Sequence, residues 1–529
     1  MASSSDSNTI SELPSLPKAL TQRSLVGWLS LFGPGAVVAS VTIGTGELIF
    51  STRGGVLFGY NILFLFVFIS LLKWALVFGT SKHLLLTGVH PFRRMLDLPG
   101  PRGWMALMFL MIILVAQPVW VSFHSSVLGN YFALLTGTTD SLNGAAQFLW
   151  AIVMIGGVLC LSMFGGYNVM EKVQIGVVAG LMVAAVASMV MYNPDYFEIL
   201  KGFVTPVFGD YPEWIHEDPK FRDIAQTNKW VELTTYVGVI GGAGFDYMAY
   251  TTWLRDKRWG YAGTNPPSPE LIEEIANDPD HEARKWLKAP IVDCAISFAL
   301  IITFSTVFVT SGVKMLGPRE AIPDSANMLG QQAEILTNVH QWLYPLYVAG
   351  AVLTMFGTLY GTFEIGVAIV MEILRSFNPS WANTRRTGIE RNMLLWQAGL
   401  ALCVVLMMFQ LVYKAGLEEA ENAKSIILKI LRPVNLFTGV ISCSVFCFVN
   451  AWIEQKHVHK NLRSKTWIQF TYLFAGLVFA ILGGMGAWMN HREGEGFLVT
   501  RWFSIGGLLA VVACSAIFVN RFRRWVESR

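Results

Sequence analysis

The chain has 529 residues, of which 53% are hydrophobic and only 14% are charged. Soluble proteins carry roughly 25% charged residues, so this composition excludes an ordinary soluble enzyme. The formal net charge of +3 is too small to indicate a nucleic-acid partner. A membrane-crossing helix needs about 20 apolar residues, and the charges here are gathered between long apolar runs. We therefore predict an all-helical integral membrane protein.

About twelve apolar runs, bounded by charged residues, glycine or proline, are long enough to be membrane spans. We place them at 27–52, 56–80, 104–134, 145–165, 169–191, 229–254, 287–312, 340–374, 392–414, 425–453, 468–490 and 498–520. The polar segment 1–26 lacks the charged start and apolar centre of a signal peptide, which favours a cytoplasmic tail. The longest loops are 192–228 and 255–286.

The distribution of Lys and Arg among the short loops indicates the orientation of the chain. They gather after the second, sixth, eighth and tenth spans and at the C-terminus, whereas the loop 135–144 has none. Because cytoplasmic loops carry the excess of positive charge, both termini are predicted to be cytoplasmic. We expect a multi-pass protein of the plasma membrane, in contact with lipid, that is a monomer or a weak homodimer.

The first and sixth spans contain glycine clusters at their centres, each followed by a carboxylate. Residues 44–47 read Gly-Thr-Gly-Glu, and residues 241–246 read Gly-Gly-Ala-Gly-Phe-Asp. Both spans then continue to an arginine at the predicted membrane edge, Arg53 or Arg255. Glycine also serves close helix packing, and either cluster alone would fit that alternative. Interruptions at matching positions of two repeats instead indicate a transporter substrate site.

These matched interruptions predict two inverted repeats of five helices followed by two additional helices. The first repeat would span 27–191 and the second 229–453, with 192–228 as an external loop. Residues 454–529 would contain the two additional helices and the cytoplasmic C-terminus. We expect the chain to be unwound near residues 44–46 and 241–244.

The two carboxylates at the interruptions, Glu47 and Asp246, are predicted to form a cation site. A charge near the bilayer centre costs at least about 2.5–3.5 kcal/mol and usually has a role. Backbone oxygens near Thr42 and Ala243 would complete the site, with Thr45 and Gly46 on the substrate pathway. Hard oxygen ligands of this kind suit Mg²⁺ or Mn²⁺. The metal would be the substrate, and no cofactor is expected.

Other polar residues inside the spans are candidates for the substrate pathway. Glu364 could serve as a second-site carboxylate, His124 could relay protons or pack through a hydrogen bond, and Asn435 could add an oxygen ligand. Asp293 could belong to the pathway or pair with a nearby lysine. Lys73 could snorkel or neutralise a carboxylate, and we favour a structural role.

The chain resembles the Nramp (natural resistance-associated macrophage protein) family of divalent-metal transporters. The resemblance covers roughly residues 27–452 in patches and rests on short motifs. These are Gly33-Pro34-Gly35, Leu86-Thr87-Gly88, Gly241 to Ala243, Gly357-Thr358-Leu359-Tyr360-Gly361 and Val370-Met371-Glu372. It implies a LeuT-type fold with ten core helices in two inverted repeats. It also implies that Gly44 belongs to the metal site and that Tyr247 lies on the substrate pathway.

The chain departs from the family pattern where metal selectivity is set. The family has Asp-Pro-Gly-Asn in the first span, so its metal-binding Asp falls on Gly44 and its Asn on Glu47. In the sixth span, the family's methionine ligand falls on Asp246 and the histidine linked to proton coupling on Met248. Losing the soft thioether removes the preference for transition metals over hard ions.

Proton coupling is also in doubt, because the family's acidic pair in the third span falls near Phe123 and Ser126. We therefore expect a transporter of divalent cations, with Mg²⁺ or Mn²⁺ favoured. The alternative is a secondary transporter of a small organic solute such as an amino acid or amine, because residues 43–46 also look like the first helix of amino-acid permeases. An enzyme is not expected, since HExxH, GxSxG, P-loop and CxxC motifs are absent from the sequence.

Overall fold

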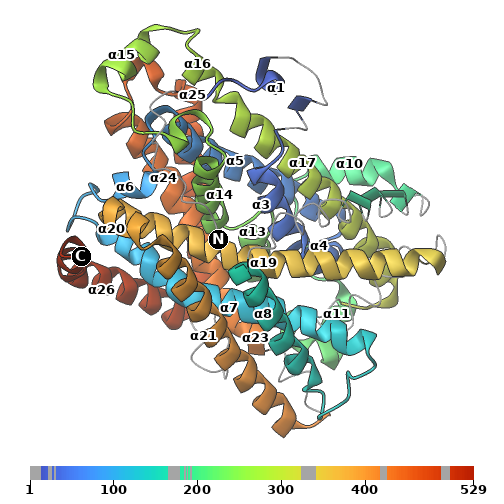
Figure 1. The fold of residues 1–529 in the computed structure, drawn as a ribbon. Coiled ribbons are helices and arrows are strands. Elements are labelled where there is room, and N and C mark those ends of the chain that lie inside the picture. Colours follow the sequence, from blue (N-terminus) through green and yellow to red (C-terminus); the bar gives the residue numbers. More distant parts are fainter. Residues whose placement is uncertain are drawn as a thin grey trace.

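The computed structural model describes residues 13–21, 27–28, 31–164, 179–180, 182–183, 186–187, 189–190, 194–322, 337, 341–417, 426–489 and 501–529. Within these ranges the regular structure is entirely helical (Figure 1). Nine of the described helices are long and apolar enough to cross a membrane. This confirms an all-helical, multi-pass protein, while the total of twelve spans stays a prediction. The predicted fifth span, 169–191, lies mostly outside the described residues.

The long helices follow the other predicted spans closely, because apolar runs of this length have no stable alternative in a membrane. They are α3 (Pro34–Ile43), α4 (Thr45–Phe58), α5 (Ile62–Thr87), α7 (Trp104–Leu135), α8 (Ala146–Phe164), α13 (Lys229–Val239), α14 (Gly244–Asp256), α17 (Lys288–Ser311), α19 (Tyr344–Phe377), α21 (Arg386–Ala415), α23 (Ile426–Asn435), α24 (Ser442–Lys456), α25 (Thr466–Met489) and α26 (Arg501–Glu527). A π-helical segment, η7 (Leu436–Ile441), joins α23 to α24, and another, η4 (Gly312–Leu316), extends α17.

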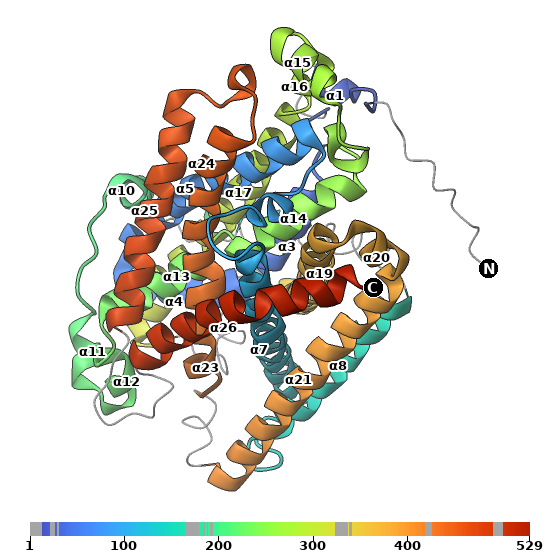
Figure 2. The same ribbon diagram turned by 90° about the vertical axis from the view of Figure 1, so that its left-hand side faces the viewer.

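Short helices lie in the connecting segments. They are α1 (Lys18–Thr21), α6 (Pro91–Met95), α10 (Tyr196–Val204), α11 (Glu213–Glu217), α12 (Arg222–Ala225), α15 (Pro269–Asn277), α16 (Glu282–Lys285) and α20 (Pro379–Thr384). Helices α15 and α16 lie beside α1 and away from α10 and α11 (Figures 1 and 2). The Trp286 indole, at the end of α16, donates a hydrogen bond to the Pro14 carbonyl at 3.2 Å. The two longest loops therefore occupy different regions of the molecule.

Both predicted interruptions are present, which confirms the broken first and sixth spans. Residues Ile240–Ala243 separate α13 from α14, and the backbone has positive φ at Gly241 (75°) and Gly242 (90°). Glycine adopts this conformation without the strain that a side chain would cause. The first break is shorter than predicted. Only Gly44 is non-helical, because Leu48 N–H already donates to the Gly44 carbonyl at 3.2 Å and α4 resumes at once. The prediction that Thr45 and Gly46 are unwound is therefore wrong.

Helix α3 is held at both ends by side chains of distant helices. At its start, the Asp293 carboxylate of α17 accepts hydrogen bonds from the backbone N–H groups of Gly33 (3.0 Å) and Gly35 (2.8 Å). At its end, the Thr358 hydroxyl of α19 donates to the Val41 carbonyl at 3.0 Å. A carboxylate at a helix N-terminus is favourable because it meets the positive end of the helix dipole. Asp293 thus caps a helix, a role not among those expected for it.

Candidate functional site

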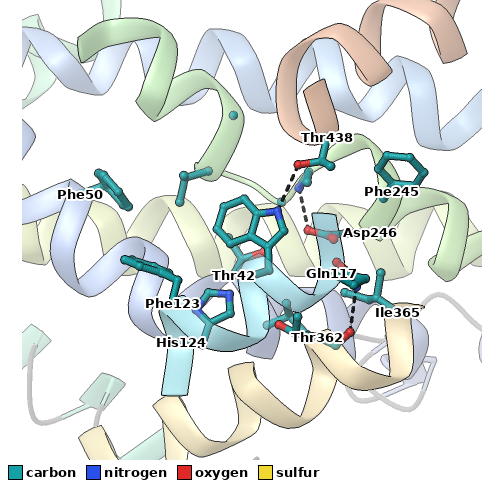
Figure 3. Close-up of a pocket in the computed structure, with 16 residues that line it drawn as sticks. Thr42, Phe50, Gln117, Phe123, His124, Phe245, Asp246, Thr362, Ile365 and Thr438 are labelled. Atoms are coloured by element: carbon teal, nitrogen blue, oxygen red, sulfur yellow. Dashed lines mark hydrogen bonds between the residues drawn. The ribbon is translucent and has the colours of Figure 1, made fainter. Parts of the chain in front are cut away.

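A cavity of about 50 Å³ lies beside the second break, between α3, α7, α14, α19 and the π-helix η7 (Figure 3). Its polar lining comes from Thr42, Gln117, His124, Asp246, Thr362 and Thr438, and its aromatic lining from Phe50, Trp120, Phe123 and Phe245. The elements that meet here are far apart in the sequence. The predicted site residues Thr42, His124, Ala243 and Asp246 are brought together at this cavity.

Asp246 is the carboxylate that lines the cavity directly. It lies in the first turn of α14, and one of its oxygens accepts a hydrogen bond from Ala243 N–H at 2.6 Å. A Cβ added to Gly242 would lie 3.2 Å from this same carboxylate oxygen and 3.4 Å from the Thr42 hydroxyl. The two oxygens therefore converge on one face of the break, where the absence of a side chain at Gly242 leaves the backbone accessible.

Glu47 lies on the other side of the same break and is completely buried. One carboxylate oxygen accepts hydrogen bonds from the hydroxyls of Ser51 (2.6 Å) and Ser305 (2.5 Å), and the other is 3.4 Å from Gly241 N–H. Glu47 is not one of the described residues that line the cavity. Glu47 and Asp246 thus bind amides two residues apart in the break. A shared cation site for the two stays a prediction.

Lys73 of α5 is the third charged side chain at this break. It is completely buried, and its ammonium donates hydrogen bonds to the carbonyls of Val237 (2.8 Å), Ile240 (2.6 Å) and Gly242 (2.5 Å). Of the two alternatives considered for Lys73, this burial excludes snorkelling, and the bonds to backbone carbonyls agree with the structural role that we favoured. The carbonyls at the end of α13 have no partners within their own helix, and the ammonium supplies the donors that they lack.

Two buried hydroxyl groups near the break have no hydrogen-bond partner among the described residues, those of Ser70 and Tyr247. A Cβ added to Gly241 would lie 3.4 Å from the Ser70 hydroxyl, and one added to Gly242 would lie 3.6 Å from the Tyr247 ring. Buried polar groups are nearly always paired with protein, water or a ligand. These two hydroxyls are therefore suited to bind a hydrated ion or water close to the break.

The remaining predicted residues are distributed around this region. His124 lines the cavity and stacks on Trp120, with 5.4 Å between ring centroids. The Asn435 amide donates to the Thr235 carbonyl at 3.0 Å and so joins α23 to α13. Gly44 packs against α19, since a Cβ at this position would lie 1.6 Å from the Thr358 hydroxyl oxygen. The side chains at positions 45 and 46 lie outside the described part of the structure.

Glu364 lines a second cavity, of about 170 Å³, between α14, α19 and α21. Three arginines and two other carboxylates also line it, namely Arg255, Arg375, Arg386, Asp256 and Glu390. Because the neighbouring residues Thr362 and Ile365 line the first cavity, α19 contributes to both cavities over a single helical turn. Glu364 is thus placed beside the candidate site.

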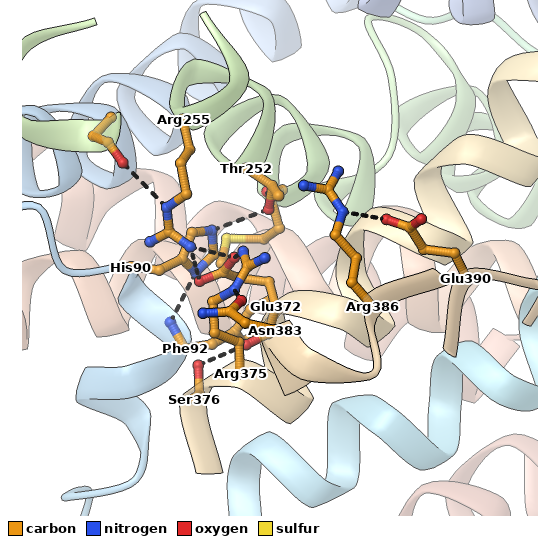
Figure 4. A network of polar contacts seen from close by, with 12 residues as sticks. His90, Phe92, Thr252, Arg255, Glu372, Arg375, Ser376, Asn383, Arg386 and Glu390 are labelled. Carbon is orange, nitrogen blue, oxygen red and sulfur yellow. Dashed lines mark hydrogen bonds and ion pairs between the residues drawn. The ribbon is translucent and has the colours of Figure 1, made fainter. Parts of the chain in front are cut away.

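A network of ion pairs joins α14 to α19 at this second cavity (Figure 4). The Arg255 guanidinium donates to both carboxylate oxygens of Glu372, at 2.8 and 2.7 Å, and Arg375 donates to the same carboxylate at 2.7 Å. In the other half-helix, Arg53 of α4 pairs with the buried Glu232 of α13 at 2.5 Å. Each arginine that follows a break therefore holds its half-helix to a carboxylate of another element.

Several residues of the site were missed from the sequence. The Gln117 amide donates to the Thr362 carbonyl at 2.8 Å, and the Trp120 indole donates to the Thr438 hydroxyl at 3.1 Å. Gln117 could have been found, because it is an amide followed by a proline inside a long apolar run. The threonines could not have been found in this way. A threonine hydroxyl can bond to a carbonyl of its own helix anywhere in a membrane span, so its presence there does not indicate a site.

The described residues contain no group of three or more His, Cys, Asp or Glu side chains close enough to bind a metal ion together. A cation at the first cavity would therefore be bound by the Asp246 carboxylate together with hydroxyl, backbone and water oxygens. Such a donor set contains only hard ligands, which hard divalent cations prefer.

Comparison with known protein families identifies the chain. The model of the family described as natural resistance-associated macrophage protein-like matches residues 35–489. The chain belongs to the Nramp family. The resemblance inferred from the sequence is thereby confirmed, and membership in a family of transporters supports the expectation that the Nramp chain is not an enzyme.

Solved structures confirm the LeuT-type fold of this Nramp chain. The manganese transporter of Eremococcus coleocola, solved in complex with an aromatic bis-isothiourea substituted compound, is similar with a TM-score of 0.67 at 14% identity, covering 99% of each chain. Two variants of that transporter are similar with TM-scores of 0.65 at 13% identity, covering 98% of this chain and 99% of theirs. No curated protein matches the chain in sequence.

Proposed function

We propose that this protein transports divalent metal cations across the plasma membrane by alternating access, with Mg²⁺ or Mn²⁺ as the favoured substrate. Its membership in the Nramp family supports metal transport, and a solved structure with the same fold belongs to a manganese transporter. The two termini would lie in the cytoplasm. The two repeats, 27–191 and 229–453, would move relative to each other around the break in each repeat.

The single observation that carries this proposal is the small cavity lined by Asp246. Its volume of about 50 Å³ accommodates an ion with a few water molecules, whereas sites for small organic ligands are roughly 300–1,000 Å³. The cavity thus favours an ion over the alternative substrate, an amino acid or amine. The Thr42 hydroxyl and the Asp246 carboxylate converge near Gly242 and would supply the first protein ligands.

The chemistry of these ligands supports a hard cation. Asp246 stands where the family has its thioether ligand, so oxygen replaces sulfur at this position. Mg²⁺ dehydrates reluctantly and is commonly bound by one or two carboxylates together with water. The Tyr247 hydroxyl, which has no hydrogen-bond partner among the described residues, would bind such a water molecule. We infer that Cd²⁺, which prefers sulfur, has no advantage over Mg²⁺ and Mn²⁺ here.

Transport would be weakly coupled or uncoupled to protons. Met248 cannot carry a proton, and His124 stacks on Trp120 at the cavity wall. Without a coupled proton, entry of a divalent cation would follow the membrane potential, which contributes about 2.3 kcal/mol per charge per 100 mV.

The test is uptake into proteoliposomes that contain an internal pH dye, with Mg²⁺, Mn²⁺, Ca²⁺ and Cd²⁺ each supplied outside. We expect Mg²⁺ or Mn²⁺ uptake without stoichiometric acidification. Asp246→Asn should lower uptake at least about tenfold, because a charged ligand contributes roughly 1.5–3 kcal/mol. Asp140→Asn, at an exposed carboxylate, serves as the matched control and should retain full uptake.

Three results would contradict the proposal. Normal uptake and normal calorimetric binding by Asp246→Asn would place the metal site elsewhere. Cd²⁺ outcompeting Mg²⁺ strongly would refute the hard-ligand argument, and stoichiometric acidification that His124→Ala abolishes would refute uncoupled transport. Glu47→Gln tests the shared site, since loss of divalent binding in this variant as well would assign both carboxylates to the cation.

A further inference from the structure

Lys73 is a buried charged residue for which metal transport gives no role. Its ammonium lies among three backbone carbonyls, those of Val237, Ile240 and Gly242, at 2.5–2.8 Å. All three hydrogens of the ammonium are therefore used, and none of these three bonds goes to a carboxylate. A lysine whose purpose was to neutralise a carboxylate would instead make its shortest contacts with that carboxylate.

A second buried lysine on the same helix shows this ordinary arrangement. The Lys82 ammonium donates to the Glu454 carboxylate at 2.6 Å and to the Ser464 hydroxyl at 2.8 Å. The two lysines lie on one helix and are both buried, yet they bind different kinds of partner. Lys82 makes an ion pair, whereas Lys73 fills a cage of neutral oxygens.

The cage has the chemistry of a site for a monovalent cation. Its carbonyls belong to the last turn of the half-helix α13 and to the break that follows it, where the helix dipole is negative. Unwound carbonyls at the C-terminal end of a half-helix are the groups that bind small cations in broken membrane helices. The Ser70 hydroxyl, one turn before Lys73 on α5, lies near Gly241 and has no partner among the described residues. It would supply a fourth oxygen.

We propose that the Lys73 ammonium is a tethered cation, which permanently occupies a carbonyl cage at the break between α13 and α14 that would otherwise bind a free monovalent cation. Lys73 is a positioning residue: it fixes the backbone of residues 240–242 next to the cavity. The chain therefore needs no bound Na⁺ or K⁺ at this position. This inference does not rest on the proposed metal transport, because it concerns a different set of oxygens.

The experiment removes the Lys73 ammonium by substitution and then supplies a free monovalent cation to fill the empty carbonyl cage. Purified Lys73→Ala protein is titrated with methylammonium, Na⁺ or K⁺, with choline chloride keeping the ionic strength constant, and thermal unfolding is followed. We expect at least one of the three cations to raise the midpoint of this variant saturably, by about 2–3 °C at saturation. The control Lys201→Ala removes an exposed lysine that pairs with the exposed Glu198, and it should show no saturable response because water already solvates both groups.

The same titration on the wild-type protein tests the proposal even if Lys73→Ala does not fold. Wild-type protein should unfold at the same temperature in Na⁺, K⁺, methylammonium and choline, because its cage is already filled. A saturable rise with Na⁺ or K⁺ in wild type would overturn the proposal, as would a folded Lys73→Ala protein that none of the three cations stabilises. No divalent ion is used, so failure here is distinct from failure of the proposed function.

Discussion

His90, at the start of α6, is a buried side chain whose protonation should control stability. Burial lowers the pKa of His90 to about 4; Arg255 and Arg375 act in the same direction, and Glu372 opposes them. Its ring is already engaged, since Nδ1 accepts from Phe92 N–H at 3.3 Å and Nε2 lies 3.3 Å from the Thr252 hydroxyl. A proton on this ring would therefore lie in a dry, positively charged environment.

The pH dependence of unfolding should reflect this histidine. In the unfolded chain it has a pKa near 6.5, so between about pH 6.5 and pH 4 the unfolded state binds a proton that the folded state does not. Stability should fall by about 3 kcal/mol as the pH drops through this window. In His90→Asn, where asparagine can still cap α6, that part of the loss should vanish. Thermal unfolding at several pH values measures it, and parallel pH profiles for the two proteins would refute the assignment.

At single positions, the sequence predicted which residues lie near the break better than it predicted which partners their side chains bind. Asp246, Thr42 and His124 were expected at the site and line the cavity. Glu47 lies at the same break but bonds to Ser305 of a distant helix, which no local pattern indicates. The partners of Lys73 are backbone carbonyls, which every residue possesses, so sequence alone could not identify them.

Among the elements, the short helix α3 is held by side chains from elsewhere in the chain. It has ten residues, and isolated helices of this length are unstable. The Asp293 carboxylate caps its start and also accepts a hydrogen bond from the Tyr250 hydroxyl at 3.0 Å. Asp293 therefore connects α3, α14 and α17.

Removing this carboxylate should loosen the first turn of α3. Asp293→Ala leaves two backbone amides and one hydroxyl without their partner, at a cost of about 1–3 kcal/mol. We expect hydrogen exchange at the Gly33 and Gly35 amides to accelerate roughly 10- to 100-fold. As a control, Asp195→Ala removes the cap of α10, where the carboxylate accepts from Phe197 and Glu198 N–H, and should affect only that helix. Unchanged exchange at 33–35 in Asp293→Ala would show that other contacts hold α3.

The elements themselves were largely predictable. Every predicted span outside 169–191 overlaps one or more of the observed helices, because hydrophobic length determines what can cross a membrane. The positions of both breaks were predicted correctly from the glycine clusters in the sequence. They did not give the length of the first break, since the return to helix after Gly44 depends on one backbone hydrogen bond, Leu48 N–H to Gly44 carbonyl.

Across the whole molecule, buried ion pairs join helices that are distant in sequence. Glu372 of α19 is 2% exposed and binds two arginines, Arg255 of α14 and Arg375 of its own helix. Removing one partner of a buried ion pair leaves the others charged and uncompensated in a poorly solvated region. The α14–α19 contact should therefore depend strongly on Glu372.

Glu372→Gln should lower the free energy of unfolding by about 3–5 kcal/mol. The matched control is Glu390→Gln in the pair with Arg386, whose side chains are 31% and 55% exposed. An exposed pair of this kind contributes about 0–1 kcal/mol. Thermal unfolding of both variants in one detergent makes the comparison, and equal destabilisation by the two substitutions would contradict it.

The contact between Gly44 and Thr358 restricts which substitutions the chain can accept in succession. A side chain at position 44, including the aspartate that the family pattern places there, would begin 1.6 Å from the Thr358 hydroxyl oxygen and 2.7 Å from its Cβ. Thr358 cannot simply be made smaller first, because its hydroxyl also bonds the Val41 carbonyl at the end of α3. Either single change is therefore costly. A side chain at position 44 is thus accessible to this chain only together with a compensating change at Thr358, so the two positions constrain each other's substitutions.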